Sequence, residues 1–135
     1  MQKVEHIGIA VRKLSVSIPL FENLLNTICY KTETVESENV NTAFFQKSET
    51  KIELLESSTS DGVIAKFIEK RGEGIHHIAF KSDEINNELS RLNNAGIQLI
   101  NSEPREGAHE MLIAFLHPKS TGGVLMEICE PKHDH

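Results

Sequence analysis

The chain has 135 residues, which is the size of one compact domain. Hydrophobic residues make up 39% and charged residues 25%, a balance that excludes disordered and fibrous chains. A net charge of −6, with no Lys/Arg-rich run, argues against a nucleic-acid or anionic-membrane partner.

Targeting and redox signals are weak. No apolar run approaches the roughly 18 residues that a membrane span needs, and the first residues carry no apolar signal region. Cys29 and Cys129 show no metal or redox spacing. They indicate reduced thiols in a cytoplasmic protein, and whether the two interact stays open.

The first half of the chain predicts a strand, a helix and three further strands. Residues 4–11 are rich in Ile and Val and alternate in part, which is typical of a strand. Ser15 or Ser17 is expected to cap a helix that runs to about Asn26. One apolar stripe is expected along this helix, made of Val16, Leu20, Phe21, Leu24 and Leu25. The strands that follow are expected at 29–35, 41–46 and 51–56.

The second half repeats this order. Residues 75–81 predict a strand, and Ser82 is expected to cap a helix that Gly96 ends. The apolar positions of that helix are Ile85, Leu89 and Leu92. Strands are expected at 97–101, 111–117 and 124–128, and an amphipathic helix at 62–70 connects the halves. We predict one α+β domain, residues 1–135, with tandem βαβββ modules at 1–58 and 74–131 and a linking segment at 59–73.

Three short matches, in the same order along the chain, indicate an internal duplication. The segment 4–11 resembles 75–80, and the segment 43–45 resembles 114–116, both at an offset of 71 positions. The segment 51–56 resembles 125–130 at an offset of 74. The extra residues fall in the turn before the last strand, where insertions are tolerated.

A His and a Glu occur at matching places in both halves. Strand alternation places His6 and His77 on the face opposite the residues expected under each helix, and it places Glu53 and Glu127 likewise. A half-buried carboxylate in a strand is costly unless it is paired or bound to a metal. Imidazole with carboxylate suits Zn, Co, Ni, Fe or Mn. The duplication favours a divalent metal site built from these four residues.

Other interpretations of the same residues stay open. Glu53 and Glu127 also fit the solvent face of an antiparallel sheet, as we expect for Glu56 and Glu130. His76 competes with His77, but alternation places His76 on the helix side of its strand.

The remaining histidines carry less signal. His133 and His135 lie in a polar tail that we expect to be solvated. His109 and His117 are expected in loops that border a pocket. The loop at 117–123, His-Pro-Lys-Ser-Thr-Gly-Gly, is rich in backbone N–H groups and fits either an anion or a simple long hairpin loop.

These features resemble the vicinal-oxygen-chelate (glyoxalase) superfamily and, within it, the methylmalonyl-CoA epimerases. The segments that carry the resemblance are 6–11, 50–56, 72–80 and 115–127, and the segments 67–70 and 104–109 also fit. The most specific parts are Gly-Ile-His-His at 74–77 and His-Pro-Lys-Ser at 117–120. The resemblance therefore covers nearly the whole chain.

The resemblance implies a cup-shaped mixed sheet around a divalent metal. The implied ligands are His6, Glu53, His77 and Glu127, and the ligand at the Glu53 position varies in type, because some family members carry Gln there. It also implies cobalt as the usual metal, with Zn²⁺, Ni²⁺ or Mn²⁺ as alternatives, a homodimer, and a small-molecule acyl-CoA substrate. Loose candidates for contacts with CoA are Lys119, Ser120 and Arg105.

Three positions depart from the family pattern. Glu110 takes the last place of a loop that commonly reads Gly-Ala-His-Gly, so the shape of that loop is open. Thr42 stands where one family member carries a catalytic Glu, so that role does not transfer. Asn26 replaces a helix-ending Gly and also tolerates the left-handed conformation.

The implied reaction is the interconversion of (2R)- and (2S)-methylmalonyl-CoA through removal of the C2 proton. A metal acting as Lewis acid would stabilise the enolate. Glu127 is expected to be both ligand and acid/base, and Glu53 to act on the opposite face of C2. The alternatives are glyoxalase I and a metal-free small-molecule or drug-binding protein of the same fold. An iron extradiol dioxygenase fits less well, because a second Glu would fill a coordination position that it needs open.

Overall fold

The chain forms two compact units. The computed structural model describes residues 1–132, so the tail residues His133 and His135 lie outside the described residues. The N-terminal unit comprises residues 6–76, and the C-terminal unit comprises residues 1–5 and 77–132 of the described chain. The predicted module bounds at 58 and 74 stay a prediction. The helix between them belongs to the N-terminal unit.

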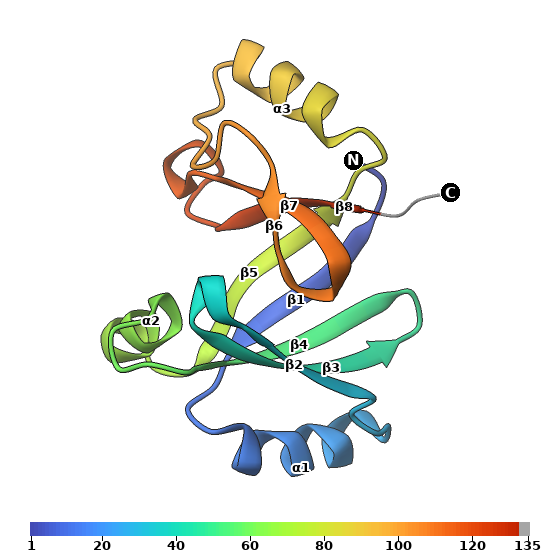
Figure 1. Ribbon diagram of the computed structural model, residues 1–135, viewed down its shortest axis with the longest axis vertical. Helices are drawn as coiled ribbons and strands as arrows, with labels where there is room; N and C mark the ends of the chain where they lie inside the picture. The colour runs from blue at the N-terminus through green and yellow to red at the C-terminus, as the bar shows by residue number, and fades with distance from the viewer. Residues whose placement is uncertain (133–135) are drawn as a thin grey trace. The chain divides into compact units, whose positions relative to one another are not determined.

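The N-terminal unit is a four-stranded sheet with a helix packed on each face (Figure 1). Its strands are β1 (Val4–Ala10), β2 (Lys31–Val35), β3 (Val40–Lys47) and β4 (Thr50–Ser57). They lie in the order β2-β3-β4-β1, with β1 parallel to β4 and the other pairs antiparallel. The helices are α1 (Leu14–Leu25) and α2 (Val63–Arg71), and a 3₁₀ turn, η1 (Glu36–Glu38), links β2 to β3.

Strand alternation decides which residues each helix covers. Ala43, Phe45 and Leu54 are fully buried under α1, and fully burying a side chain the size of Phe or Leu contributes about 1.5–3 kcal/mol. Ala10 and Leu55 lie on the other face and pack against α2. The face that carries His6 is therefore partly covered by α2.

The predicted stripe of α1 is wrong in part. Phe21 and Leu25 pack inward, joined by Leu14 and Ile18. Val16, Leu20 and Leu24 point outward and are 65%, 51% and 65% exposed. The error has a physical cause: α1 is apolar on two sides, so periodicity alone did not identify the buried one.

The C-terminal unit repeats the N-terminal topology. Its strands are β5 (Gly74–Lys81), β6 (Arg105–Glu106), β7 (Met111–Leu116) and β8 (Met126–Pro131), in the order β5-β8-β7-β6. β5 is parallel to β8, and the other pairs are antiparallel. The helix α3 (Ile85–Asn94) packs Ile85, Leu89 and Leu92 onto one face. The predicted βαβββ order is confirmed in both halves.

The second strand of this unit does not lie at the predicted residues 97–101. Residues 97–101 form no regular strand and make only one bridge, between Leu99 and Leu116. The two-residue strand β6 pairs with β7 instead. The expectation failed because Asn101 bonds the N–H of Phe115 through its side-chain Oδ1, which interrupts a backbone ladder at that point.

Both repeat helices begin at a glutamate from the last strand of the same repeat. Glu56 accepts a hydrogen bond from the N–H of Leu14 at 3.1 Å, and Glu130 accepts one from the N–H of Ile85 at 2.7 Å. A carboxylate at a helix N-terminus accepts a hydrogen bond from a backbone N–H of the first turn, and its negative charge complements the helix dipole. The serines expected as caps do not fill that role: Lys13 and Glu84 occupy the cap positions, and neither side chain accepts a capping hydrogen bond from a backbone N–H of its helix. Glu56 and Glu130 were wrongly expected to face solvent alone.

Two helix ends follow the sequence. Asn26 adopts the left-handed conformation (φ 51°, ψ 48°) and its N–H bonds the carbonyl of Glu22. Gly96 has φ 87° and follows Ala95, the C-cap residue of α3, as expected for the residue that ends a helix. None of the helices within residues 1–132 has the length and hydropathy that a membrane-spanning helix requires.

Candidate functional site

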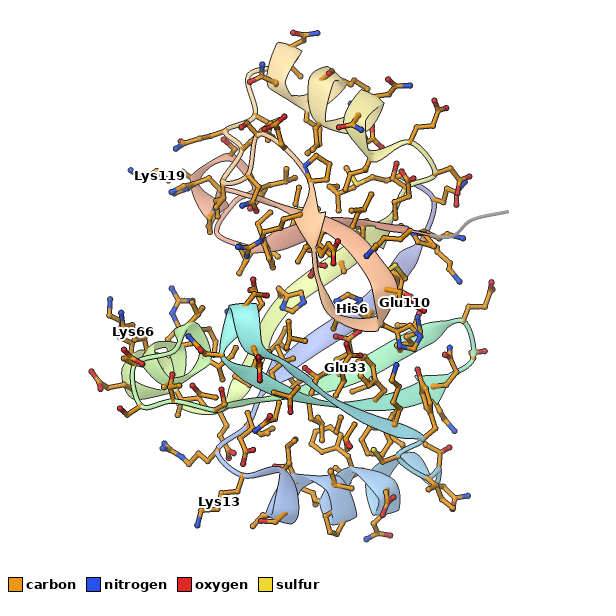
Figure 2. The ribbon with its side chains drawn as sticks, in the orientation of Figure 1. His6, Lys13, Glu33, Lys66, Glu110 and Lys119 are labelled. Atoms are coloured by element: carbon orange, nitrogen blue, oxygen red, sulfur yellow. The ribbon has the colours of Figure 1, made fainter. Side chains whose placement is uncertain are left out.

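The N-terminal unit brings His6 and Glu53 together. His6 lies on β1 and Glu53 on β4, and the parallel register of these strands sets Gly8 opposite Glu53. Because Gly8 has no side chain, the carboxylate reaches His6, with His6 Nδ1 3.2 Å from Glu53 Oε2. Both residues are buried, at 5% exposure each. Figure 2 shows His6 on the face of the sheet that is turned away from α1 and Lys13.

The C-terminal unit brings His77 and Glu127 together in the same way. Ala79 on β5 lies opposite Glu127 on β8, and this small residue leaves room for the carboxylate. His77 Nε2 is 3.0 Å from Glu127 Oε1, and both residues are buried. The ring of Phe115 meets His77 edge to face, with centroids 5.7 Å apart, and so fixes the imidazole from the side.

The donor set of each pair suits a divalent metal. Imidazole nitrogen and carboxylate oxygen are the ligands that Zn, Co, Ni, Fe and Mn accept. Burial of an ionised carboxylate is costly unless an opposite charge, hydrogen bonds or a metal compensates for it. A buried His–Glu pair in each unit therefore provides two ligands of suitable chemistry, and the His–Glu contact also orients both side chains in the absence of an ion.

The competitor His76 has a different environment. Its ring meets Phe67 of α2 edge to face, with centroids 5.0 Å apart. His76 therefore packs against α2, which is not the helix at 85–94 under which strand alternation predicted its side chain.

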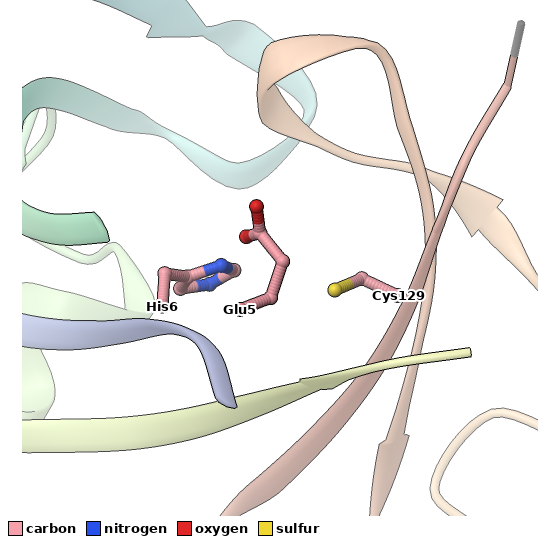
Figure 3. Close-up of side chains that lie close together, drawn as sticks. All are labelled: Glu5, His6 and Cys129. Atoms are coloured by element: carbon pink, nitrogen blue, oxygen red, sulfur yellow. The ribbon is translucent and has the colours of Figure 1, made fainter. Parts of the chain in front are cut away.

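Sequence reasoning missed a second group of buried polar residues, in the C-terminal unit. Glu5, at the start of β1, and Cys129, on β8, are both buried and present a carboxylate oxygen and a sulfur within 4.8 Å of each other (Figure 3). Strand alternation places Cys129 on the face of Glu127, a signal that was available in the sequence. Within the described residues both Cys29 and Cys129 are thiols, and neither forms a disulfide.

The loops around β7 differ in what they offer. In the loop after β7, which contains η3 (Pro118–Ser120), the N–H groups of Lys119, Ser120 and Thr121 bond His117 or Pro118. These bonds favour the interpretation as a structural loop over an anion site.

Before β7, in η2 (Ala108–Glu110), His109 and Glu110 both adopt positive φ, at 58° and 54°. Glu110 thus keeps the left-handed shape that a glycine would adopt more easily.

Comparison with known proteins identifies the family. Residues 5–115 match the model of the Glyoxalase/Bleomycin resistance protein/Dioxygenase superfamily. The chain is 34% identical to the ethylmalonyl-CoA/methylmalonyl-CoA epimerase of Cereibacter sphaeroides, over 93% of this chain and 96% of that protein. It is 44% identical to YqjC, an uncharacterized protein of Bacillus subtilis, over 99% and 96% of the two chains.

Comparison with solved structures identifies the same family. A single-residue variant of Streptomyces coelicolor methylmalonyl-CoA epimerase, in complex with 2-nitronate-propionyl-CoA, matches with a TM-score of 0.91 and 30% identity. The match covers 97% of this chain and 95% of that chain. On this evidence of sequence and fold, the chain belongs to the glyoxalase superfamily and, within it, to the methylmalonyl-CoA epimerase family.

Proposed function

We propose that the protein is a metal-dependent epimerase that interconverts (2R)- and (2S)-methylmalonyl-CoA. The observation that carries the proposal is the repeated, buried His–Glu pair, one in each unit, in a chain whose relatives are named as epimerases of this substrate. The proposed metal ligands are His6, Glu53, His77 and Glu127. Cobalt is the metal we expect.

The chemistry of the substrate explains the need for two carboxylates. The C2 proton lies between a thioester and a carboxylate, so its removal leaves negative charge that both groups share. The bound metal supplies Lewis-acid stabilisation of that charge. Inversion at C2 requires one group to take the proton from one side and another to return a proton on the other. Glu127 and Glu53, one from each repeat, are the two groups that we assign.

The roles of the two glutamates differ in our assignment. Glu127 accepts the C2 proton through a carboxylate oxygen, and its partner His77 is held by Phe115. Glu53, oriented by His6, returns a proton on the opposite side. Burial of both carboxylates excludes water that would otherwise screen their charge.

We also propose that the protein is a homodimer, and that the outward face of α1 forms the contact with a second copy. Val16, Leu20 and Leu24 form an exposed apolar stripe, and Ile28 continues it at 77% exposure. Large exposed apolar patches mark interaction sites. Residues 14–30 contain one charged residue, Glu22, so a second copy of this acidic chain meets little repulsion there.

The ends of α1 are complementary as well. Lys13 lies at the N-terminal end of α1 (Figure 2), while the last turn carries no basic residue to offset the negative end of the helix dipole. An antiparallel pair of α1 helices, related by a twofold axis, brings Lys13 of each copy to the uncompensated end of the other.

The experiment that tests the function measures both metal and activity. The purified protein is expected to contain about one divalent ion per chain, to epimerise methylmalonyl-CoA, to lose activity on chelation and to regain it with Co²⁺. Turnover of methylglyoxal with glutathione, and not of methylmalonyl-CoA, would replace the proposal by glyoxalase I. Absence of bound metal together with absence of turnover would favour the small-molecule-binding alternative.

A further inference from the structure

We infer that the Thr42 hydroxyl is a substrate-binding group that donates a hydrogen bond to the free carboxylate of the acyl group. This inference rests on the proposed function and assigns a residue that the repeated His–Glu pairs do not include. Thr42 is 1% exposed, and its Oγ1 has no hydrogen-bond partner among the described residues. A buried polar group without a partner is rare in native proteins and indicates a missing partner.

The register of the sheet places Thr42 beside the His6–Glu53 pair. Thr42 lies opposite Leu55, and Phe44 lies opposite Glu53, so Thr42 and Glu53 are diagonal neighbours on β3 and β4. Diagonal neighbours lie about 7–8 Å apart on one face of a sheet. The residues on either side of Thr42 along the chain face the other way, because Ala43 packs under α1.

The surroundings of Thr42 select the kind of ligand. Leu55 and Val40 form an apolar patch with α2 on one side of Thr42, and Glu53 carries its carboxylate on the other. Glu33 lies opposite Thr42 on β2, and its carboxylate is engaged by Lys31 at 3.5 Å. Thr42 is therefore a neutral donor between an apolar patch and the proposed metal ligands, which suits one end of a small branched carboxylate.

Two other hydroxyl groups in the same sheet have hydrogen-bond partners. Thr34 Oγ1 bonds Asn41 Oδ1 at 2.8 Å, and Ser57 Oγ donates to the carbonyl of Thr59 at 2.6 Å. A valine has nearly the shape of Thr42, suits a strand equally well and needs no partner. The Thr42 hydroxyl makes no hydrogen bond within the described residues that would explain a threonine at this buried position. We therefore assign a ligand as its hydrogen-bond partner.

The test compares Thr42→Val with Thr42→Ser and with Thr32→Val, a matched control on the exposed α1 side of β2. Thr42→Val is expected to raise the KM for methylmalonyl-CoA about 10- to 100-fold, with kcat within a few-fold of the parent, because the contact is made by substrate and transition state alike. Thr42→Ser and Thr32→Val are expected to keep the parent KM. The metal content of Thr42→Val is expected to equal that of the parent protein, and its Tm is expected to be unchanged or higher.

A second ligand makes the assignment specific. Propionyl-CoA lacks the free carboxylate, so its inhibition constant is expected to be the same for the parent protein and Thr42→Val. A KM for Thr42→Val within twofold of the parent, in an enzyme that turns over methylmalonyl-CoA, would overturn the inference and leave the proposed function standing. A parent protein with no turnover of methylmalonyl-CoA would overturn both.

Discussion

The helices α1 and α3 hold equivalent places in the two βαβββ repeats, but they use their apolar residues differently. α3 buries Ile85, Leu89 and Leu92 and presents asparagines and serine to solvent. α1 buries one apolar side and leaves a second exposed along its length. A feature present in both units, such as the His–Glu pair, points to a shared role, whereas the outer face of α1 points to a contact that only the N-terminal unit makes.

The His–Glu pairs themselves are alike but not identical. In the N-terminal unit the histidine meets its glutamate through Nδ1, and in the C-terminal unit through Nε2. Small residues, Gly8 and Ala79, stand opposite the two glutamates. The duplication has preserved residue types and burial while the side-chain geometry has diverged, which leaves room for the two glutamates to take different roles.

The largest effect is expected from Glu127. Glu127→Gln keeps the size of the side chain but removes a proposed base and weakens a proposed ligand, so both epimerisation and exchange of the C2 proton are expected to fall by at least about 10³-fold. NMR of methylmalonyl-CoA in D2O measures both. Retention of either activity within tenfold of the parent would remove Glu127 from the mechanism.

Glu53→Gln should separate the two halves of the reaction. If Glu127 takes the proton and Glu53 returns it on the other side, Glu53→Gln is expected to slow epimerisation by about 10²-fold or more while one epimer still exchanges C2 with solvent. Chiral analysis of deuterated substrate measures the two processes separately. Equal loss of both processes in Glu53→Gln and Glu127→Gln would mean that the two glutamates do not divide the work as proposed.

The outer face of α1 predicts a change of assembly. Leu20→Glu is expected to weaken dimerisation about 100-fold, because it places an unpaired charge in an apolar contact. Ser90→Glu, at an exposed position of α3, is the matched control and is expected to leave assembly unchanged. Sedimentation over a range of concentrations gives the dissociation constants. A parent protein that is monomeric throughout would contradict the proposed role of α1.

The smallest effects are expected from the helix caps. Glu56→Ala and Glu130→Ala are each expected to lower the free energy of unfolding by about 1 kcal/mol, since each removes an acceptor at a helix N-terminus. Glu69→Ala, at an exposed position of α2, serves as the control and is expected to change stability by less than about 0.5 kcal/mol. Urea unfolding measures the differences. Losses of unfolding free energy that differ by more than a factor of three between Glu56→Ala and Glu130→Ala would show that the two glutamates do not stabilise their helices equally.

Much of this architecture is predictable from the sequence because the signals are periodic. Strand alternation alone predicts that His6 and Glu53 share one face, and the duplication predicts the same for His77 and Glu127. The same argument chose His77 over His76, whose ring packs on Phe67. These inferences depend only on local geometry and an internal copy.

The errors arise where tertiary contacts decide. Glu56 and Glu130 read as solvent-facing strand residues, and only the folded chain shows that each reaches the first N–H of a helix more than 40 residues away. The orphaned hydroxyl of Thr42 is also invisible in sequence, because a threonine in a strand normally finds a neighbour. Val16, Leu20 and Leu24 have the helical spacing that the sequence predicts, but they lie on the exposed side of α1 and not on the buried side.

The measurement that tests the central claim most directly is proton exchange at C2 of methylmalonyl-CoA in D2O. The parent protein loaded with Co²⁺ is expected to incorporate deuterium and to scramble the C2 configuration, and the chelated protein is expected to do neither until metal is restored. Incorporation at the same rate with and without metal, or none in the loaded protein, would contradict the proposal that the His–Glu pairs form a metal-dependent epimerase site.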